Sequence, residues 1–443
     1  MKKISIYTLI LLLAGSLSLR AESYTLHSFL DHVEQYSNEL KLAHKQVDLA
    51  AAQKKEAVAG ALPSVTANAS YDRHLSDTYM YVDMSALTGG EGSAQKLKIN
   101  RNNNYALSVG LSQTIFSLNV HNAIKASRQY QKLTDYSYDA SHLEIMTYAK
   151  KGFYSTLLLK TVWEVSQASM ENAHENYLDV KQKYENGLVS EFDLLQAEVR
   201  WKDMISQTSE AKKNYDLALI SLKNLAGIPA GDEISLEGSL DQYPEMPPDM
   251  DFESILQSRP DYNALIWEEK LRSTNISSER SGYFPSLTGS FTYSFSSQSD
   301  EWSFDEKNDS WILGLNLSVP LFKGGATRAR VQKARIEYDQ TAIRIDRTVD
   351  DIYKEIESVR LRLDESSSRI NSARATLNTA EKAFHIAEAS SQNGLATQLE
   401  LKDARLVLDQ ANVNYYAAIY AFLEALFDWE QTTGGVYRAF PNN

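Results

Sequence analysis

The residues of this sequence that could do chemistry are carboxylates that follow two Gly-containing turns. Asp193 stands six residues after Gly187, and Glu400 and Asp403 stand six and nine residues after Gly394. The sequence has no His-Glu-x-x-His, Walker or Gly-x-Ser-x-Gly pattern, its eight His are scattered, and it contains zero Cys. We therefore expect no enzyme, no catalytic residue, no cofactor and no metal site. The carboxylates remain as groups that could attract cations.

Both turns have the same local pattern, and the two copies are 207 residues apart. Gly ends the preceding helix, because it adopts the left-handed C′ conformation without steric cost. A hydroxyl residue then begins the next helix, and the acid three positions later fits a reciprocal capping box. We expect each copy to be a tight reversal between two helices. The residues expected at the two tips are Asn186, Gly187, Leu188, Ser190, Asn393, Gly394, Leu395 and Thr397.

Capping accounts for two of the three carboxylates. Asp193 and Glu400 each stand where an acid closes a capping box and favours the helix dipole. Asp403 caps nothing, and Asp is a mediocre helix former in a helix interior. It follows Glu400 by three residues, so the two project from nearly the same face. Asp403 therefore either lines a site together with Glu400 or makes a solvated ion pair, for example with Lys402 or Arg405 of a neighbouring chain.

The turns belong to a plan that the chain repeats, in the order helix, β-hairpin, long helix, turn and helix. Pro63 and Pro285 precede the first strand of each copy, and Gly227 and Gly434 end the last helix of each. We expect a first repeat over 22–227, with a hairpin at about 64–116 and long helices over about 119–225. We expect a second repeat over 252–434, with a hairpin at about 286–322 and long helices over about 327–429. A signal peptide over 1–21, a linker over 228–251 and a tail over 435–443 complete the expected organisation.

The N-terminal sequence indicates where the protein is located, and the net charge restricts the kinds of partner that it can bind. Lys2 and Lys3 precede an apolar stretch, and a small-residue site ends at Ala21, so a secreted chain should begin near Glu22. Residues 1–21 contribute three positive charges to the total of −13, so the remainder carries −16. We expect no nucleic-acid partner, because phosphate binding needs clustered Lys and Arg.

Four segments alternate apolar and aromatic residues with Ser, Thr, Asn and Gly, as in 287–295 and 311–319. This alternation is typical of a transmembrane barrel with a lipid face and a polar lumen, although a soluble sheet with one wet face gives the same pattern. The signal peptide and the aromatic residues favour the barrel. Four strands cannot close a barrel, and an open edge cannot lie in lipid. Several chains must therefore combine, and three would supply twelve strands.

The last helix carries apolar and small residues in several stripes with a spacing of seven. Leu399, Leu406, Val413 and Tyr420 form one stripe, and Ala residues from Ala404 onward form another. A sustained heptad repeat predicts coiled-coil packing. More than one apolar or small-residue stripe predicts that this helix contacts neighbouring helices on two of its faces. We expect a curved wall of helices. The alternative, a structural or adhesive trimeric coiled coil at the cell surface, does not need the four strands.

Taken together, these features resemble the TolC-like outer-membrane efflux protein family. The resemblance covers nearly all of residues 24–434. It is carried by the duplicated layout, the two Gly-Leu turns with their acids, Ala197 and Ala404 further on, and the run Ser258-Arg259-Pro260-Asp261. It implies an α+β membrane protein that acts as a homotrimer. A twelve-stranded outer-membrane β-barrel would continue into a long coiled-coil barrel of helices in the periplasm of a Gram-negative-type cell.

The resemblance also implies a function and a site. The trimer would be a passive exit duct for a tripartite efflux or type I secretion system, working with a periplasmic adaptor and an inner-membrane transporter. The tips would dock the adaptor, and Asp193, Glu400 and Asp403 would line a periplasmic constriction. Known members latch their tips with an aromatic residue and an Arg beside the second turn, where this chain has Ser391 and Ala396. The expected latch is therefore missing.

Overall fold

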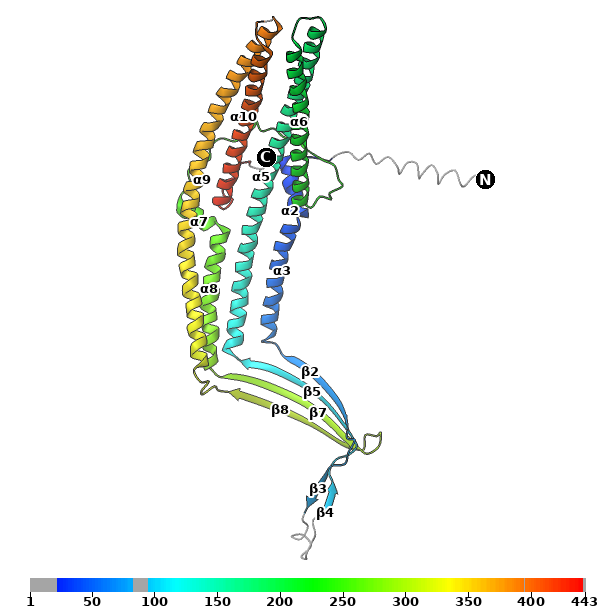
Figure 1. Cartoon of the computed structure of the whole chain (residues 1–443). Helices are drawn as coiled ribbons and strands as arrows, with labels where there is room; N and C mark the ends of the chain where they lie inside the picture. The colour runs from blue at the N-terminus through cyan, green and yellow to red at the C-terminus, as the bar shows by residue number, and fades with distance from the viewer. Residues whose placement is uncertain (1–21, 83–94, 394, 441–443) are drawn as a thin grey trace, which may run out of the picture. The chain divides into compact units, whose positions relative to one another are not determined.

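The computed structural model describes residues 22–82, 95–393 and 395–440, and most of them are helical (Figure 1). The helices are α2 (Leu26–Tyr36), α3 (Asn38–Ala59), α5 (Leu118–Glu185), α6 (Glu191–Ala226), α7 (Phe252–Ser258), α8 (Pro260–Arg280), a 3-10 turn (Ser281–Tyr283), α9 (Ala326–Gln392) and α10 (Gln398–Thr432). None of the helices among the described residues is both long and apolar enough to cross a bilayer. The signal peptide expected over 1–21 lies outside the described residues.

The chain forms two compact units, and each unit takes segments from both predicted repeats. Unit 1 contains residues 22–47, 134–265 and 344–440, and unit 2 contains residues 48–82, 95–133 and 266–343. The long helices α3, α5, α8 and α9 each run from one unit into the other. The compact units therefore cut across the repeats, because helices of the two halves pack beside one another.

Unit 2 contains the strands that the alternation predicts. One antiparallel sheet has the order β2-β5-β7-β8, and its strands are β2 (Ser64–Arg73), β5 (Asn103–Phe116), β7 (Ser286–Ser299) and β8 (Glu306–Ser318) (Figure 1). The register aligns Val109 with Tyr293 and Tyr293 with Trp311, so the apolar residues of neighbouring strands share one face. Trp311 is 64% exposed. The outer strands β2 and β8 leave the sheet open at both edges.

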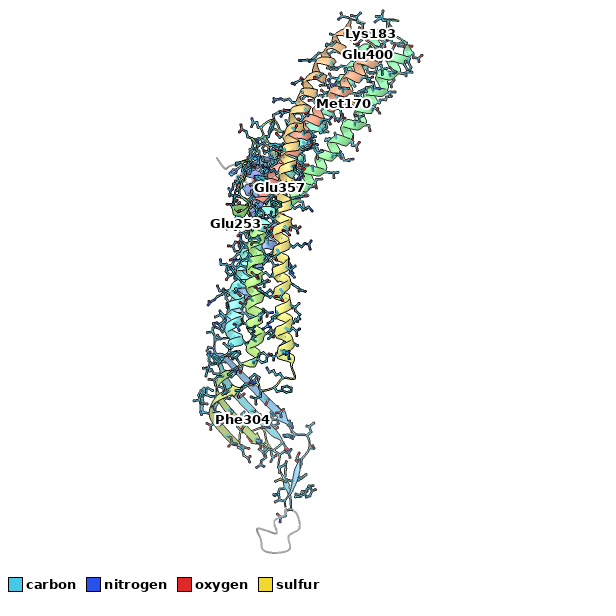
Figure 2. The ribbon with its side chains drawn as sticks, turned by 90° about the vertical axis from the view of Figure 1, so that its left-hand side faces the viewer. Met170, Lys183, Glu253, Phe304, Glu357 and Glu400 are labelled. Atoms are coloured by element: carbon cyan, nitrogen blue, oxygen red, sulfur yellow. The ribbon has the colours of Figure 1, made fainter. Side chains whose placement is uncertain are left out.

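An aromatic cluster extends the apolar face toward the loop end of the sheet. Tyr71 lies 5.1 Å from Tyr105 and 5.3 Å from Trp302, between ring centroids. Phe304 lies 4.7 Å from Tyr105, and Figure 2 shows it on the sheet. Aromatic rings at the end of an apolar strand face are typical of a bilayer–water interface.

Between β2 and β5 the sequence is polar and contains Gly, a composition that favours a loop, but two short strands form there. Within it, β3 (Tyr79–Val82) pairs with β4 (Gln95–Lys98) in an antiparallel hairpin. Cross-strand pairs such as Met80 with Leu97 supply the contacts that the composition of the segment did not reveal. Residues 79–82 and 95–98 are therefore strands rather than loop.

Unit 1 has a large apolar core around the second half of α10. Ile419, Leu423 and Leu426 are fully buried there, and Phe29 of α2 and Phe153 of α5 belong to the same core. Because the end of α10 is apolar on nearly every side, it can be stable only when it is surrounded by other elements. This packing agrees with the two-sided stripes in the sequence of α10.

The segment 228–251, which we predicted as a linker, packs against the core of unit 1. Ile228, Ile234 and Leu240 are buried in the core of unit 1. Its strand β6 (Ile234–Leu236) pairs in parallel with β1 (Glu22–Tyr24). The Pro, Gly and acidic residues obscured these buried aliphatic residues. The tail also packs inward, since Phe440 stacks on Tyr154 at 5.8 Å.

A buried guanidinium joins three helices of unit 1. Arg259, between α7 and α8, bonds the Asp261 carboxylate at 2.8 Å, Glu355 of α9 at 2.8 Å and the Thr432 carbonyl oxygen at the end of α10 at 3.3 Å. Its side chain is 11% exposed. Burial opposes the charge of Arg259, but the two carboxylates outweigh it and raise the pKa. Burial likewise opposes the charge of Asp261, but Arg259 lowers the pKa of that carboxyl.

We expect Arg259→Ala to lower the free energy of unfolding by about 2 kcal/mol, less than for a fully buried pair, because both carboxylates are half exposed. The measurement is chemical denaturation of the purified protein in detergent, followed by circular dichroism. The control is Arg347→Ala, because Arg347 makes an exposed pair with Asp351 along α9. Equal losses for the two variants would contradict a structural role for the buried guanidinium.

Candidate functional site

The first turn, between α5 and α6, depends on a left-handed glycine. Gly187 has φ 69°, its N–H donates to the Tyr184 carbonyl oxygen at 2.9 Å, and the Leu188 N–H donates to the Lys183 carbonyl oxygen at 2.8 Å. These two bonds form a Schellman motif and satisfy carbonyls at the end of α5. A Cβ added at Gly187 would meet no atom within 4 Å, so the backbone conformation rather than lack of space requires glycine.

The capping box predicted at the start of α6 is present. The Ser190 hydroxyl oxygen accepts from the Asp193 N–H at 3.2 Å. In return, the Asp193 carboxylate accepts from the N–H of Ser190 at 3.1 Å and from its hydroxyl at 2.7 Å. Asp therefore replaces the usual Glu or Gln in this box, and one oxygen of its carboxylate, Oδ2, accepts both bonds.

The second turn, between α9 and α10, repeats this arrangement. The Leu395 N–H donates to the Ser390 carbonyl oxygen at 2.8 Å, which corresponds to the Leu188 bond of the first turn. The Glu400 carboxylate accepts from the Thr397 N–H at 2.8 Å and from its hydroxyl at 3.0 Å. Gly394 itself lies outside the described residues, so its predicted conformation stays a prediction.

The cap changes the ionisation of Glu400. The bond from the Thr397 N–H, and then the bond from its hydroxyl, lowers the pKa of the Glu400 carboxyl. A lowered pKa means that the ionised carboxylate stabilises the folded turn above the ordinary pKa of Glu. This contribution is lost as the pH falls through the lower, folded-state value. The turn is therefore capped at neutral pH.

Asp403 differs from the two capping acids. Its side chain is exposed and makes no hydrogen bond or ion pair with the described part of the chain. Within the chain, Arg405 turns away from it toward Asp409, with Nε 3.0 Å from Oδ1. These two atoms are close enough for an ion pair but are not aligned for a hydrogen bond. Asp403 therefore keeps an unneutralised charge on the exposed side of α10.

A groove of about 520 Å³ lies between the two helical hairpins of unit 1, on the side of their turns. Figure 2 shows Lys183 and Glu400 toward this end. Asn176 of α5 donates to the Gln398 side-chain oxygen of α10 at 3.0 Å, and Arg405 donates to the Ser169 hydroxyl at 3.3 Å. Ser391 lines the same groove. Two polar contacts therefore join α5 to α10 across the groove.

Sequence reasoning missed these bridges. Asn176 and Gln398 are 222 residues apart, and neither belongs to a motif. Arg405 also lies 5.1 Å from the centre of the Phe384 ring, which lines the groove. The sequence did not indicate that Arg405, which follows Ala404 of the heptad stripe, contacts another helix, because basic residues at such positions are usually solvated. No group of three His, Cys, Asp or Glu residues suited to a metal ion occurs in residues 22–82, 95–393 and 395–440.

Comparison with known proteins identifies the family. The family model "Outer membrane efflux protein" matches the chain twice, over residues 30–228 and 252–435. The chain belongs to the outer membrane efflux protein family. Members of this family, including the TolC-like channels, are outer-membrane proteins with a periplasmic helical domain, so this chain is an outer-membrane protein.

Curated relatives are distant in sequence. The chain is 24% identical to the probable outer membrane lipoprotein SilC of Salmonella typhimurium, over 50% of this chain and 48% of that protein. It is 22% identical to the alkaline protease secretion protein AprF of Pseudomonas aeruginosa, over 52% and 49%. It is 22% identical to the cation efflux system protein CusC of Escherichia coli, over 57% of each. The chain thus spans about half the length of these curated relatives.

Solved structures share the fold over nearly the whole chain. The CmeC outer membrane channel of Campylobacter jejuni has a TM-score of 0.78 at 21% identity, over 94% of this chain and 87% of that one. The open state of the MtrE outer membrane channel of Neisseria gonorrhoeae has a TM-score of 0.74 at 18% identity, over 93% and 89%. The mixed helical and β architecture is therefore that of outer-membrane channels.

We expect Gly187→Val to open the first turn locally, because a β-branched residue is strained by roughly 1–2 kcal/mol in the left-handed conformation. Hydrogen exchange of the amides of residues 183–190 should become faster, and α5 and α6 should otherwise stay protected. The control is Gly231→Val, since a Cβ at Gly231 also meets nothing within 4 Å but its φ is not left-handed. Unchanged exchange around Gly187 would show that the turn tolerates a side chain.

Proposed function

We propose that three copies of this chain form an outer-membrane exit duct, with a twelve-stranded barrel that continues into a coiled-coil barrel of periplasmic helices. The observation that carries this proposal is the sheet of unit 2. It has an exposed apolar face and two unpaired edges, β2 and β8. Unpaired backbone groups cannot lie in hydrocarbon, so the β8 edge of one copy would pair with the β2 edge of the next.

We also infer the partners. The relatives are described as an alkaline protease secretion protein and a cation efflux system protein, and this supports an efflux or type I secretion duct without identifying the cargo. The energy would come from an inner-membrane transporter through a periplasmic adaptor. The tips of the two hairpins, which include Leu188 and Leu395, are exposed, and they would dock the adaptor. The channel itself would perform no chemistry.

The domain organisation is also a proposal. We infer an ancestral duplication with repeats over 22–227 and 252–434. The two matches of one family model and the two turns with equivalent bonds support it. The segment 228–251 then joins the repeats as a packed connection, and residues 435–440 follow the second repeat as a packed tail.

We propose that the acids beside the turns line the periplasmic constriction of the trimer. Asp193 and Glu400 would both cap their helices and contribute charge, whereas Asp403 has no other bonded role in the described chain. Three copies would place Glu400 and Asp403 around one axis as six carboxylates, which would attract cations. The tip latch would not follow the family pattern, because Ser391 and Ala396 supply neither an aromatic ring nor a cation.

The alternative of a structural or adhesive coiled coil is less well supported. A coiled-coil rod does not require a sheet with an exposed apolar face and aromatic residues at its end. The solved channels also match more than nine-tenths of the chain, sheet included. We therefore keep the duct as the conclusion.

The trimer can be tested by size-exclusion chromatography coupled to light scattering. Protein extracted from membranes in detergent should give a protein mass of three chains, because two open edges per chain must each find a partner. An edge variant, Leu315→Pro in β8, removes a backbone donor and should reduce the trimer. Leu315→Ala, which keeps the backbone donor at the same position, is the matched control. A stable monomer from the unmodified chain would contradict the proposed assembly.

The constriction can be tested by single-channel recording in planar bilayers. Asp403→Ala should lower cation selectivity and weaken block by trivalent cations added on the periplasmic side, because three charges leave the ring. Trimer stability should not change, since Asp403 caps nothing. The matched control is Asp364→Ala, which removes another exposed acid without a described partner, on α9. Selectivity and block equal to those of the unmodified channel would place Asp403 outside the constriction.

A further inference from the structure

A corner of unit 2, where the chain leaves the sheet and enters α9, exposes large apolar residues. Leu321 is 93% exposed and Phe322 is 89% exposed, which makes them two of the most exposed large hydrophobic side chains of the described residues. Gly324 and Gly325 follow with φ 58° and 81°, and α9 begins at Ala326. Exposed apolar side chains gathered at one place usually mark an interaction surface.

The same corner is hollow and basic. A cavity of about 210 Å³ is lined by Tyr283, Leu321 and Phe322 together with Lys323 and Arg328. Neither the Lys323 side chain nor the Arg328 side chain makes an ion pair or a hydrogen bond within residues 22–82, 95–393 and 395–440. Arg330, by contrast, pairs with Glu279 at 3.1 Å. Two unneutralised cations therefore flank an apolar hollow.

The local sequence makes this charge unusual. Residues 310–336 contain five Lys or Arg and no Asp or Glu, although the chain from residue 22 onward has net charge −16. The opposite edge of the sheet cannot supply the missing acids, because residues 57–71 contain none either. A second copy that paired β2 with β8 would therefore bring no carboxylate from this stretch to Lys323 and Arg328.

We propose that this corner binds the headgroup of an anionic phospholipid. The phosphate would lie between Lys323 and Arg328, and the acyl chains would follow the apolar face of the sheet. That face reaches the corner without interruption, since Leu315, Leu317 and Val319 of the same alternation are exposed. Phosphate supplies the negative charge that the neighbouring protein lacks, and basic residues beside an apolar surface attract acidic lipids.

The inference rests on the proposed assembly only in assigning the leaflet. In the proposed duct, the corner is on the side of the sheet that faces the periplasmic helices, so the lipid would come from the inner leaflet. The site would fix the depth of the sheet in the membrane. It would not depend on the cargo, the adaptor or the state of the entrance.

The experiment is native mass spectrometry of the full-length protein in detergent, with added phosphatidylglycerol or phosphatidylcholine. We expect phosphatidylglycerol to remain bound in preference to phosphatidylcholine. In the double variant Lys323→Gln, Arg328→Gln, the ratio of bound phosphatidylglycerol to bound phosphatidylcholine should fall on the order of tenfold. Each cation near a lipid surface contributes to the attraction of the anionic lipid. Lys323→Arg with Arg328→Lys should keep it.

The matched control is Lys181→Gln with Lys382→Gln, which removes two exposed lysines that have no described partner in unit 1. It should bind both lipids as the unmodified protein does. Equal retention of the two lipids by the unmodified protein, or an unchanged preference in the double variant, would overturn the proposal. So would displacement of the lipid by millimolar inorganic phosphate, which would indicate a free-phosphate site. Loss of the trimer with an unchanged lipid preference would assign the corner to a second copy instead.

Bilayer recordings separate this proposal from the proposed function. A double variant that loses the lipid preference but conducts normally would support the lipid site and leave the duct intact. A protein that binds phosphatidylglycerol selectively but forms no channel would refute the duct and retain the site.

Discussion

The backbone groups at the two edges of the sheet set the constraint on which the rest of this structure depends. β2 and β8 each present N–H and C=O groups that have no partner within the sheet, beside a face of exposed apolar and aromatic residues. In water such edges invite aggregation, and in hydrocarbon each unpaired group costs several kcal/mol. The proposed pairing between copies would resolve both problems at once. Because each strand pair leads directly into long helices, an assembly that closes the sheet also brings the helices of the copies together.

The helices are held by two different kinds of interaction. In unit 1, the apolar half of α10 is enclosed by α2, α5 and the segment that follows α6, and the residues of this core are buried. Toward the turns, the hairpins are joined instead by polar contacts, Asn176 with Gln398 and Arg405 with Ser169, across a groove. Polar contacts beside water can exchange their partners for solvent, whereas a buried core cannot. The turn end is therefore the more easily rearranged part of unit 1.

The acids beside the two turns differ in how far the local structure explains them. Asp193 and Glu400 complete capping boxes, so their presence needs no further reason. Asp403 has no such bond, and this makes it the more informative of the three acids. The basic corner before α9 is informative in the same way, because Lys323 and Arg328 stay unpaired in a chain with an excess of acids.

Sequence by itself determined the elements whose causes are local. The alternation of 287–295 and 311–319 gave the strands, Gly187 and Ser190 gave the first turn, and the resemblance gave the family, because period, φ preference and capping act over a few residues. Tertiary structure decided what depends on partners far along the chain. The burial of Ile234 and Leu240 in a Pro-rich and acidic segment, the hairpin of β3 and β4, the joining of Arg259 to Glu355, and the bridge from Asn176 to Gln398 are of this kind. The compact units, which combine both halves of the sequence, are another example. Such contacts are fixed by which surfaces meet after the helices pack, and no short stretch of sequence contains that information.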